Sequence, residues 1–95
     1  MPDPLGQVFS ALADESRRHV IGYLSTNGTA TATELTGELP ITRQAVAKHL
    51  ATLSDAGLVE GERQGRETRY RLTRAGEEWD DRLDALRRHL ERRRA

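Results

Sequence analysis

With 95 residues, a formal net charge of zero and 36% hydrophobic residues, the chain has the length of one domain and the composition of a folded protein. It contains no cysteine, which excludes disulfides, thiolate chemistry and cysteine-based metal sites. No apolar run reaches the roughly 18 residues of a membrane-spanning helix, and the N-terminus lacks the regions of a signal peptide, so we expect a cytoplasmic protein with no membrane partner.

The first part of the chain predicts two helices. Between residues 5 and 13 the apolar side chains recur at the spacing i, i+3, i+4, i+7, which indicates a first amphipathic helix. Asp14 can cap a second helix that stops at Asn27 and Gly28. Gly22 inside that helix costs about 1 kcal/mol of helix propensity relative to alanine. We therefore expect close packing against Gly22.

Two further helices follow with a short break between them. Residues 31–34, Thr-Ala-Thr-Glu, have the spacing of a capping box and predict a short third helix that Pro40 ends. Thr42 then caps a fourth helix, about residues 43–56, that stops at Gly57. Two helices separated by three residues have the spacing of a helix-turn-helix.

After the fourth helix the period of the sequence changes. Strands are predicted at residues 58–59 and 68–72, with Gln64 and Gly65 at the turn of a hairpin between them. A last helix follows the cap Thr73. The predicted fold class is therefore mainly α with a small β-hairpin, in the arrangement of a winged helix-turn-helix. Four helices are followed by two strands and a fifth helix, and together they form one domain over residues 1–95.

Charge is unevenly distributed along the chain. Residues 1–40 carry two basic and five acidic side chains, whereas residues 41–74 carry seven basic and four acidic ones. On a helical wheel of the fourth helix, Gln44 and Lys48 point away from its apolar face. A helix with such a polar face fits the major groove of DNA, and the arginines of the hairpin fit phosphates or a minor groove.

The sequence resembles the ArsR (arsenical-resistance repressor) family of winged-helix regulators over nearly its whole length. The similarity is carried by FSALADESRR at residues 9–18, LPITRQAVAKHL at 39–50, AGLV at 56–59 and GRETRY at 65–70. It implies a homodimer built from the first and last helices, with residues 42–49 facing double-stranded DNA and residues 63–69 in or beside the wing. We expect an operator that is an inverted repeat.

Two sets of candidate residues follow from the patterns and the resemblance. The predicted DNA-binding residues are Thr42, Arg43, Gln44, Ala45, Lys48, His49, Arg63, Arg66 and Arg69. The predicted dimer interface consists of Leu5, Val8, Phe9, Leu12, Trp79, Leu83, Leu86 and Leu90. For His49, a partly buried position near the core is the alternative, and the resemblance favours a contact with the DNA backbone.

The chain departs from the metal-sensing members of the family. Residues 33–37, Thr-Glu-Leu-Thr-Gly, stand where those members carry cysteine, and Arg82 and Leu83 stand where a carboxylate–histidine site would need histidine. The sequence thus resembles the subgroup without metal sites, and we expect no metal and no cofactor.

Other function classes have less support. The chain has no nucleophile–histidine–carboxylate spacing and no phosphate-binding glycine loop, so we do not expect an enzyme. A winged helix that binds another protein would expose an apolar face on the fourth helix, and the predicted outward face is polar and cationic instead. A DNA-binding repressor with an unrecognised small-molecule or metal switch remains an alternative.

Overall fold

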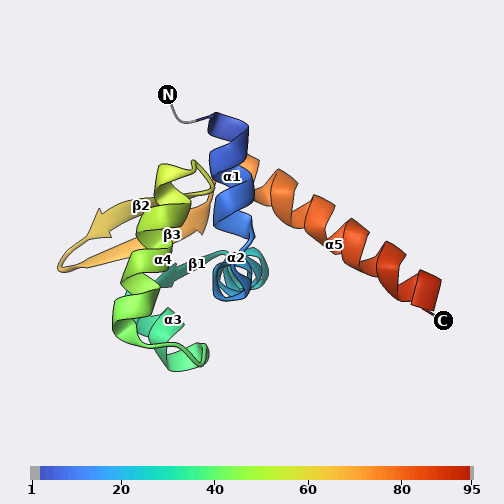
Figure 1. Ribbon diagram of the computed structural model, residues 1–95. Coiled ribbons are helices and arrows are strands. Elements are labelled where there is room, and N and C mark those ends of the chain that lie inside the picture. The colour runs from blue at the N-terminus through green and yellow to red at the C-terminus, as the bar shows by residue number, and fades with distance from the viewer. Residues whose placement is uncertain (1–2, 95) are drawn as a thin grey trace.

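The computed structural model describes residues 3–94, which form five helices and a three-stranded antiparallel sheet (Figure 1). The helices and strands, in chain order, are α1 (Pro4–Leu12), α2 (Glu15–Asn27), β1 (Thr29–Thr31), α3 (Ala32–Glu38), α4 (Arg43–Asp55), β2 (Val59–Gln64), β3 (Glu67–Leu72) and α5 (Arg74–Arg94). The winged helix-turn-helix arrangement predicted from the sequence is confirmed.

The sheet has one strand more than the sequence predicted. Its order is β1-β3-β2, and Tyr70 in the central strand pairs with Ala30 on one side and Gly61 on the other. Strand β1 has only three residues, too few for a period of two to be visible in the sequence. Its last residue, Thr31, is also the N-cap of α3. The sequence analysis therefore recognised the capping box at this position and missed the strand.

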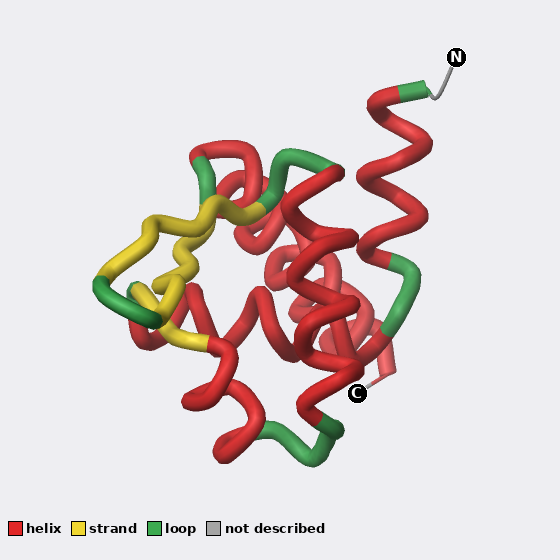
Figure 2. The backbone as a smooth tube through the Cα atoms, turned by 90° about the vertical axis from the view of Figure 1, so that its left-hand side faces the viewer, coloured by secondary structure: helices red, strands yellow, loops and turns green. Residues whose placement is uncertain are grey.

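The hairpin of β2 and β3 forms the wing, which extends from the helices as a narrow two-stranded arm (Figure 1) and points toward the viewer in Figure 2. Strand β2 continues to Gln64, well past the predicted end at Val59. Residues 60–64 are exposed and polar, and they are extended because they pair with β3 rather than because they bury side chains. At the turn, Gly65 has a φ of 63°, which glycine adopts without steric cost.

One apolar core lies between the helices and the inner face of the sheet. The side chains with less than 2% of their surface exposed include three from α2 and two from α4. The buried apolar residues are Ala11, Leu12, Val20, Ile21, Leu24, Ala30, Leu35, Val46, Leu50, Leu53, Leu58, Val59 and Leu72.

Side-chain caps begin the helices at the predicted positions. Asp14 accepts a hydrogen bond from the backbone N–H of Arg17 at 3.1 Å, and Thr42 accepts one from Ala45 at 3.1 Å. In the capping box of α3, Thr31 accepts from the N–H of Glu34 at 3.1 Å, and the Glu34 carboxylate accepts from the N–H of Thr31.

Two arginines at the start of α2 hold the end of α1. Arg17 donates through Nε to the carbonyl of Ala11 at 2.7 Å, and Arg18 donates through Nη1 to the carbonyl of Leu12 at 2.7 Å. These carbonyls belong to the last turn of α1, where a helix has no partners of its own. The pair of arginines therefore fixes the angle between α1 and α2.

The first turn of α5 lies directly on Leu58, the residue that precedes β2. A Cβ at Gly76 would fall on the carbonyl oxygen of Leu58, so only glycine fits there. By contrast, apart from its chain neighbours and the nearby backbone of α2, no described atom lies within 4 Å of a Cβ built on Gly22. The prediction of close packing at Gly22 was therefore wrong. From this start, α5 runs away from the other elements, and its C-terminal half projects outward (Figure 1).

Candidate nucleic-acid interface

The helix α4 has one buried face and one exposed polar face. Val46, Leu50 and Leu53 are at most 2% exposed and belong to the core. Gln44 and Lys48 lie on the opposite side and are exposed. The buried apolar face and the exposed polar face predicted for this helix are therefore both present. The amide of Gln44 and the ammonium of Lys48 are available to a binding partner.

The N-terminus of α4 is held against α3. Thr42 and Arg43 are both exposed, and Arg43 donates from Nη2 to Oγ1 of Thr33 at 3.1 Å. Ala45 is half-buried behind them. The sequence did not single out Thr33, because residues ten positions apart come together here only through the turn between the helices.

His49 occupies a different position from its neighbours on α4. It is half-buried, and its Nδ1 is covered and has no hydrogen-bond partner among residues 3–94. It lies near Asp14, whose pKa is lowered mainly by the N–H of Arg17, with smaller contributions from the charges of Arg17 and His49. This placement favours the partly buried position over the contact with the DNA backbone that the resemblance had favoured.

Arg63 and Arg66 flank the turn of the wing. Both are exposed, and the described residues place no carboxylate in ion-pair contact with either. Arg63 donates from Nε to the carbonyl of Gly65 at 3.0 Å, which directs it along the turn. The tip of the wing thus carries two cationic groups that are available to an anion.

Arg69, by contrast, is engaged within the protein. It donates through Nη2 to Glu34 at 3.0 Å and through Nη1 to Thr29 at 3.1 Å. Glu34 has a lowered pKa, mainly because it accepts the N–H of Thr31 and also because Thr31 Oγ1 and Arg69 stabilise the carboxylate. The sequence displayed the capping box but not its link to the wing.

A hollow of about 230 Å³ separates the wing from the start of α3. Polar side chains from both sides line it, including Thr33 from α3 and Arg66 and Thr68 from the wing. Of these two elements, only the wing was predicted to approach DNA, and the hollow also contains the carboxylate residue Glu67.

The predicted dimer residues lie on α1 and α5. Phe9 and Trp79 meet edge to face, with ring centroids 5.4 Å apart and planes at 76°. Leu5, Phe9, Leu86 and Leu90 are each more than half exposed. Val8, Trp79 and Leu83 are partly buried against the core, and Leu12 is 6% exposed, so Leu12 offers little surface to a second chain. Around Phe9, Trp79 and Leu86 lies an apolar hollow of about 310 Å³.

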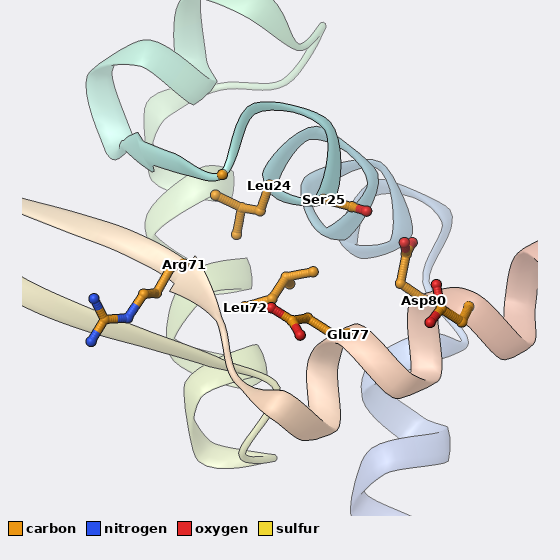
Figure 3. Close-up of a pocket in the computed structure, with 8 residues that line it drawn as sticks. Leu24, Ser25, Arg71, Leu72, Glu77 and Asp80 are labelled. Atoms are coloured by element: carbon orange, nitrogen blue, oxygen red, sulfur yellow. The ribbon is translucent and has the colours of Figure 1, made fainter.

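A third hollow, of about 340 Å³, lies between the end of α2, the strand β3 and the first turns of α5 (Figure 3). Glu77, Asp80 and Asp81 line it, while Arg71 points away toward Glu60, with which it pairs at 2.9 Å. No group of three metal-binding side chains occurs in the described part of the chain. None of the described helices is both long and apolar enough to cross a bilayer.

The fold and the polar face of α4 define a winged helix-turn-helix protein. Residues 12–62 match the family described as a helix-turn-helix domain. An uncharacterized HTH-type transcriptional regulator of Bacillus subtilis, YuzN, is 46% identical over 65 residues, which are 62% of this chain and 71% of that protein. The HTH-type transcriptional regulator Rv2034 of Mycobacterium tuberculosis is 36% identical over 86 residues, 90% of this chain and 74% of that protein.

Solved structures give the same result. An ArsR-like transcriptional regulator from Rhodococcus sp. RHA1 is 40% identical and superposes with a TM-score of 0.69, covering 93% of this chain and 91% of that one. The chain therefore belongs to the ArsR family of helix-turn-helix transcriptional regulators, a family that binds DNA and is not enzymatic.

Proposed function

We propose that this regulator is a homodimeric repressor that binds an inverted-repeat operator in double-stranded DNA, with α4 in the major groove and the wing beside it. The observation that carries this proposal is the exposed polar face of α4, on which Gln44 and Lys48 stand opposite three core residues. An amide of this kind can pair with adenine through two hydrogen bonds, and an ammonium with guanine or a phosphate.

The phosphate contacts are assigned to the residues around this helix. Thr42 and Arg43 are exposed at the start of α4, and together with the N–H groups of its first turn they can hold one phosphate. Arg63 and Arg66 at the tip of the wing supply a second anchoring point. We assign Arg69 an indirect role, because its guanidinium is already bound to Glu34 and Thr29.

The homodimer is proposed from the apolar surface of α1 and α5. Phe9, Leu86 and Leu90 are more than half exposed and lie around or beyond an apolar hollow. Burial of such side chains on a second copy removes apolar surface from water, at about 25 cal/mol per Å². A dimer also supplies the two copies of α4 that an inverted repeat requires.

Genome-wide mapping of bound sites, followed by footprinting with the purified protein, tests the proposal. We expect protected half-sites related by two-fold symmetry, with centres about one helical turn apart or somewhat more. Binding to all sequences with equal affinity would contradict the proposed operator. An absence of DNA binding, together with capture of a protein partner through α4, would favour the protein-binding alternative.

A further inference from the structure

Two arginines from different elements meet at the first turn of α3. Arg43, the first residue of α4, donates from Nη2 to Oγ1 of Thr33 at 3.1 Å. Arg69, in the wing strand β3, donates from Nη2 to Oε1 of Glu34 at 3.0 Å. Thr33 and Glu34 are neighbours in the chain, so a single turn of helix receives one contact from α4 and one from the wing.

The wing contact lies where the free arm of the wing begins. Strand β1 pairs with β3 only as far as the pair of Thr31 with Arg69, so the hairpin from there to its turn has two strands and no third strand beside it. None of residues 62–69 is buried, so the core does not hold this arm. A two-stranded hairpin by itself is only marginally stable in water. The direction of the arm therefore depends on contacts at its base, where Arg69 lies.

The carboxylate of Glu34 is held in place by its own helix. Its Oε1 accepts hydrogen bonds from the N–H of Thr31 at 3.3 Å and from Oγ1 of Thr31 at 3.2 Å, and Thr31 is only 4% exposed. Arg69 also donates from Nη1 to Oγ1 of Thr29 at 3.1 Å, so its guanidinium joins two separate acceptors. One exposed ion pair contributes little, but a planar guanidinium with two partners has a defined orientation.

The contact from α4 acts on a side chain rather than on the whole helix. Val46, Leu50 and Leu53 are at most 2% exposed and hold the axis of α4 in the core. Arg43 is exposed, so the core does not set the direction of its guanidinium. The hydrogen bond to Thr33 uses one N–H of this group and leaves its other donors available to a phosphate. A side chain that is already held loses less conformational entropy when it binds.

We propose that the first turn of α3 positions two phosphate anchors of the regulator, Arg43 on α4 and Arg66 at the tip of the wing. Thr33 orients the guanidinium of Arg43. Glu34, through Arg69, sets the direction of the wing and thereby the place of Arg66. This rests on the proposed DNA binding and adds two positioning residues to it, Thr33 and Glu34, which act through the arginines that they hold.

Such positioning makes the wing anchor depend on the contact at its base. Once α4 has bound, a held wing presents Arg66 to the DNA at a high effective concentration, whereas a swinging wing is away from the duplex for much of the time. Loss of the Arg69 contact should therefore reduce what Arg66 contributes to binding. A loss of overall stability acts differently, because it weakens the binding of every variant by the same factor.

A double-mutant cycle on the footprinted operator duplex tests the wing contact. Arg69→Met removes the donors, keeps an apolar stem and leaves the capping box of α3 intact. The matched control is Arg71→Met, because Arg71 lies on the same face of β3 but pairs with Glu60 within the hairpin. We expect Arg66→Ala to raise the Kd about tenfold in the wild type and in Arg71→Met, but about threefold or less in Arg69→Met. An equal cost in all three backgrounds would overturn the role of Arg69.

A second cycle tests Thr33. Thr33→Val removes the hydroxyl with little change of shape, and Thr33→Ser retains it. We expect Arg43→Ala to raise the Kd about tenfold in the wild type and in Thr33→Ser, but about threefold or less in Thr33→Val. Arg66→Ala should keep its full cost in Thr33→Val, because the wing contact uses Glu34. If Arg43→Ala costs the same in Thr33→Val as in the wild type, Thr33 does not orient Arg43.

Spin labels measure the wing without DNA. The chain has no cysteine, so Ala47→Cys on α4 and Gln64→Cys in the wing, both exposed positions, can be labelled selectively. An excess of unlabelled protein restricts the measured distances to one protomer. We expect a narrow distance distribution in the wild type and in Arg71→Met, and a broad one in Arg69→Met.

The spin-label result separates this inference from the proposed function. A narrow distribution in Arg69→Met, or a broad one in the wild type, would overturn the positioning of the wing even if the regulator binds its operator. Failure of the wild type to bind any duplex would instead overturn the proposed DNA binding, and with it the anchors that α3 is inferred to position.

Discussion

Arg69 in β3 lies 3.0 Å from the carboxylate of Glu34 at the start of α3, and the same carboxylate accepts the N–H of Thr31. These contacts lower the pKa of Glu34. A group with a lowered pKa in the folded state stabilises the fold above its unfolded pKa and loses that contribution as pH falls through the folded value.

We therefore expect Glu34→Gln to lower the free energy of unfolding at pH 7 and to have a smaller effect near pH 3. Urea denaturation at both pH values measures the difference. The matched control is Glu38→Gln, an exposed position on the same helix, which should change little at either pH. An equal loss for Glu34→Gln at both pH values would contradict the assignment of a stabilising carboxylate.

The two arginines Arg66 and Arg69 should differ in their effect on DNA binding. Arg66→Ala should flatten the dependence of log K on log salt by up to about two units per dimer, because each exposed guanidinium that touches a phosphate releases counterions. Arg69→Ala should weaken binding and leave this slope almost unchanged, because Arg69 is paired with Glu34. Fluorescence anisotropy at several salt concentrations measures both, and a flattened slope for Arg69→Ala would place Arg69 on a phosphate.

Gln44 should read sequence rather than anchor the protein. We expect Gln44→Ala to lose about 1–3 kcal/mol of operator affinity per half-site if the amide contacts adenine through two hydrogen bonds. Binding to random DNA should be unchanged, and the exposed position of Gln44 should leave stability as it is. Equal losses on both kinds of DNA would make Gln44 an anchoring residue.

The exposed leucines of α5 should determine the oligomeric state. Leu86→Glu with Leu90→Glu places charge in the proposed apolar interface, and we expect monomers with weak operator binding. Both positions are more than half exposed in the protomer. The two substitutions should therefore raise the dimer dissociation constant while the protomer itself stays folded, with little change in its melting temperature. The control Arg88→Gln removes a charge at another exposed position of the same helix. A double-glutamate variant that sediments as a dimer would move the interface away from α5.

Two glycines provide opposite tests of packing. Gly76→Ala should destabilise the fold by about 2–3 kcal/mol, because the new Cβ would fall on the carbonyl of Leu58. Gly22→Ala should be neutral or stabilising by up to about 1 kcal/mol, because the position is helical and no described atom outside the nearby backbone of α2 lies within 4 Å of the new Cβ. Thermal unfolding compares the two variants, and similar changes in both would contradict this account of Gly76.

The sequence alone determined the elements whose signals are local. The caps Asp14, Thr31 and Thr42 and the turn at Gly65 act within about four residues, so they predicted where helices begin and where the wing turns. The period of the apolar residues likewise predicted which face of α4 is buried. These features need only the backbone within one element, and a sequence displays them directly.

Only the tertiary structure decided the contacts between distant segments. Strand β1 exists because β3 lies beside it, and Arg69 reaches Glu34 although they are 35 residues apart in the chain. The same holds for Gly76 on Leu58 and for the open space beside Gly22. Local periodicity predicts which side of a helix or strand is buried, but not which residues lie against it. Those contacts depend on how all the elements pack around one core.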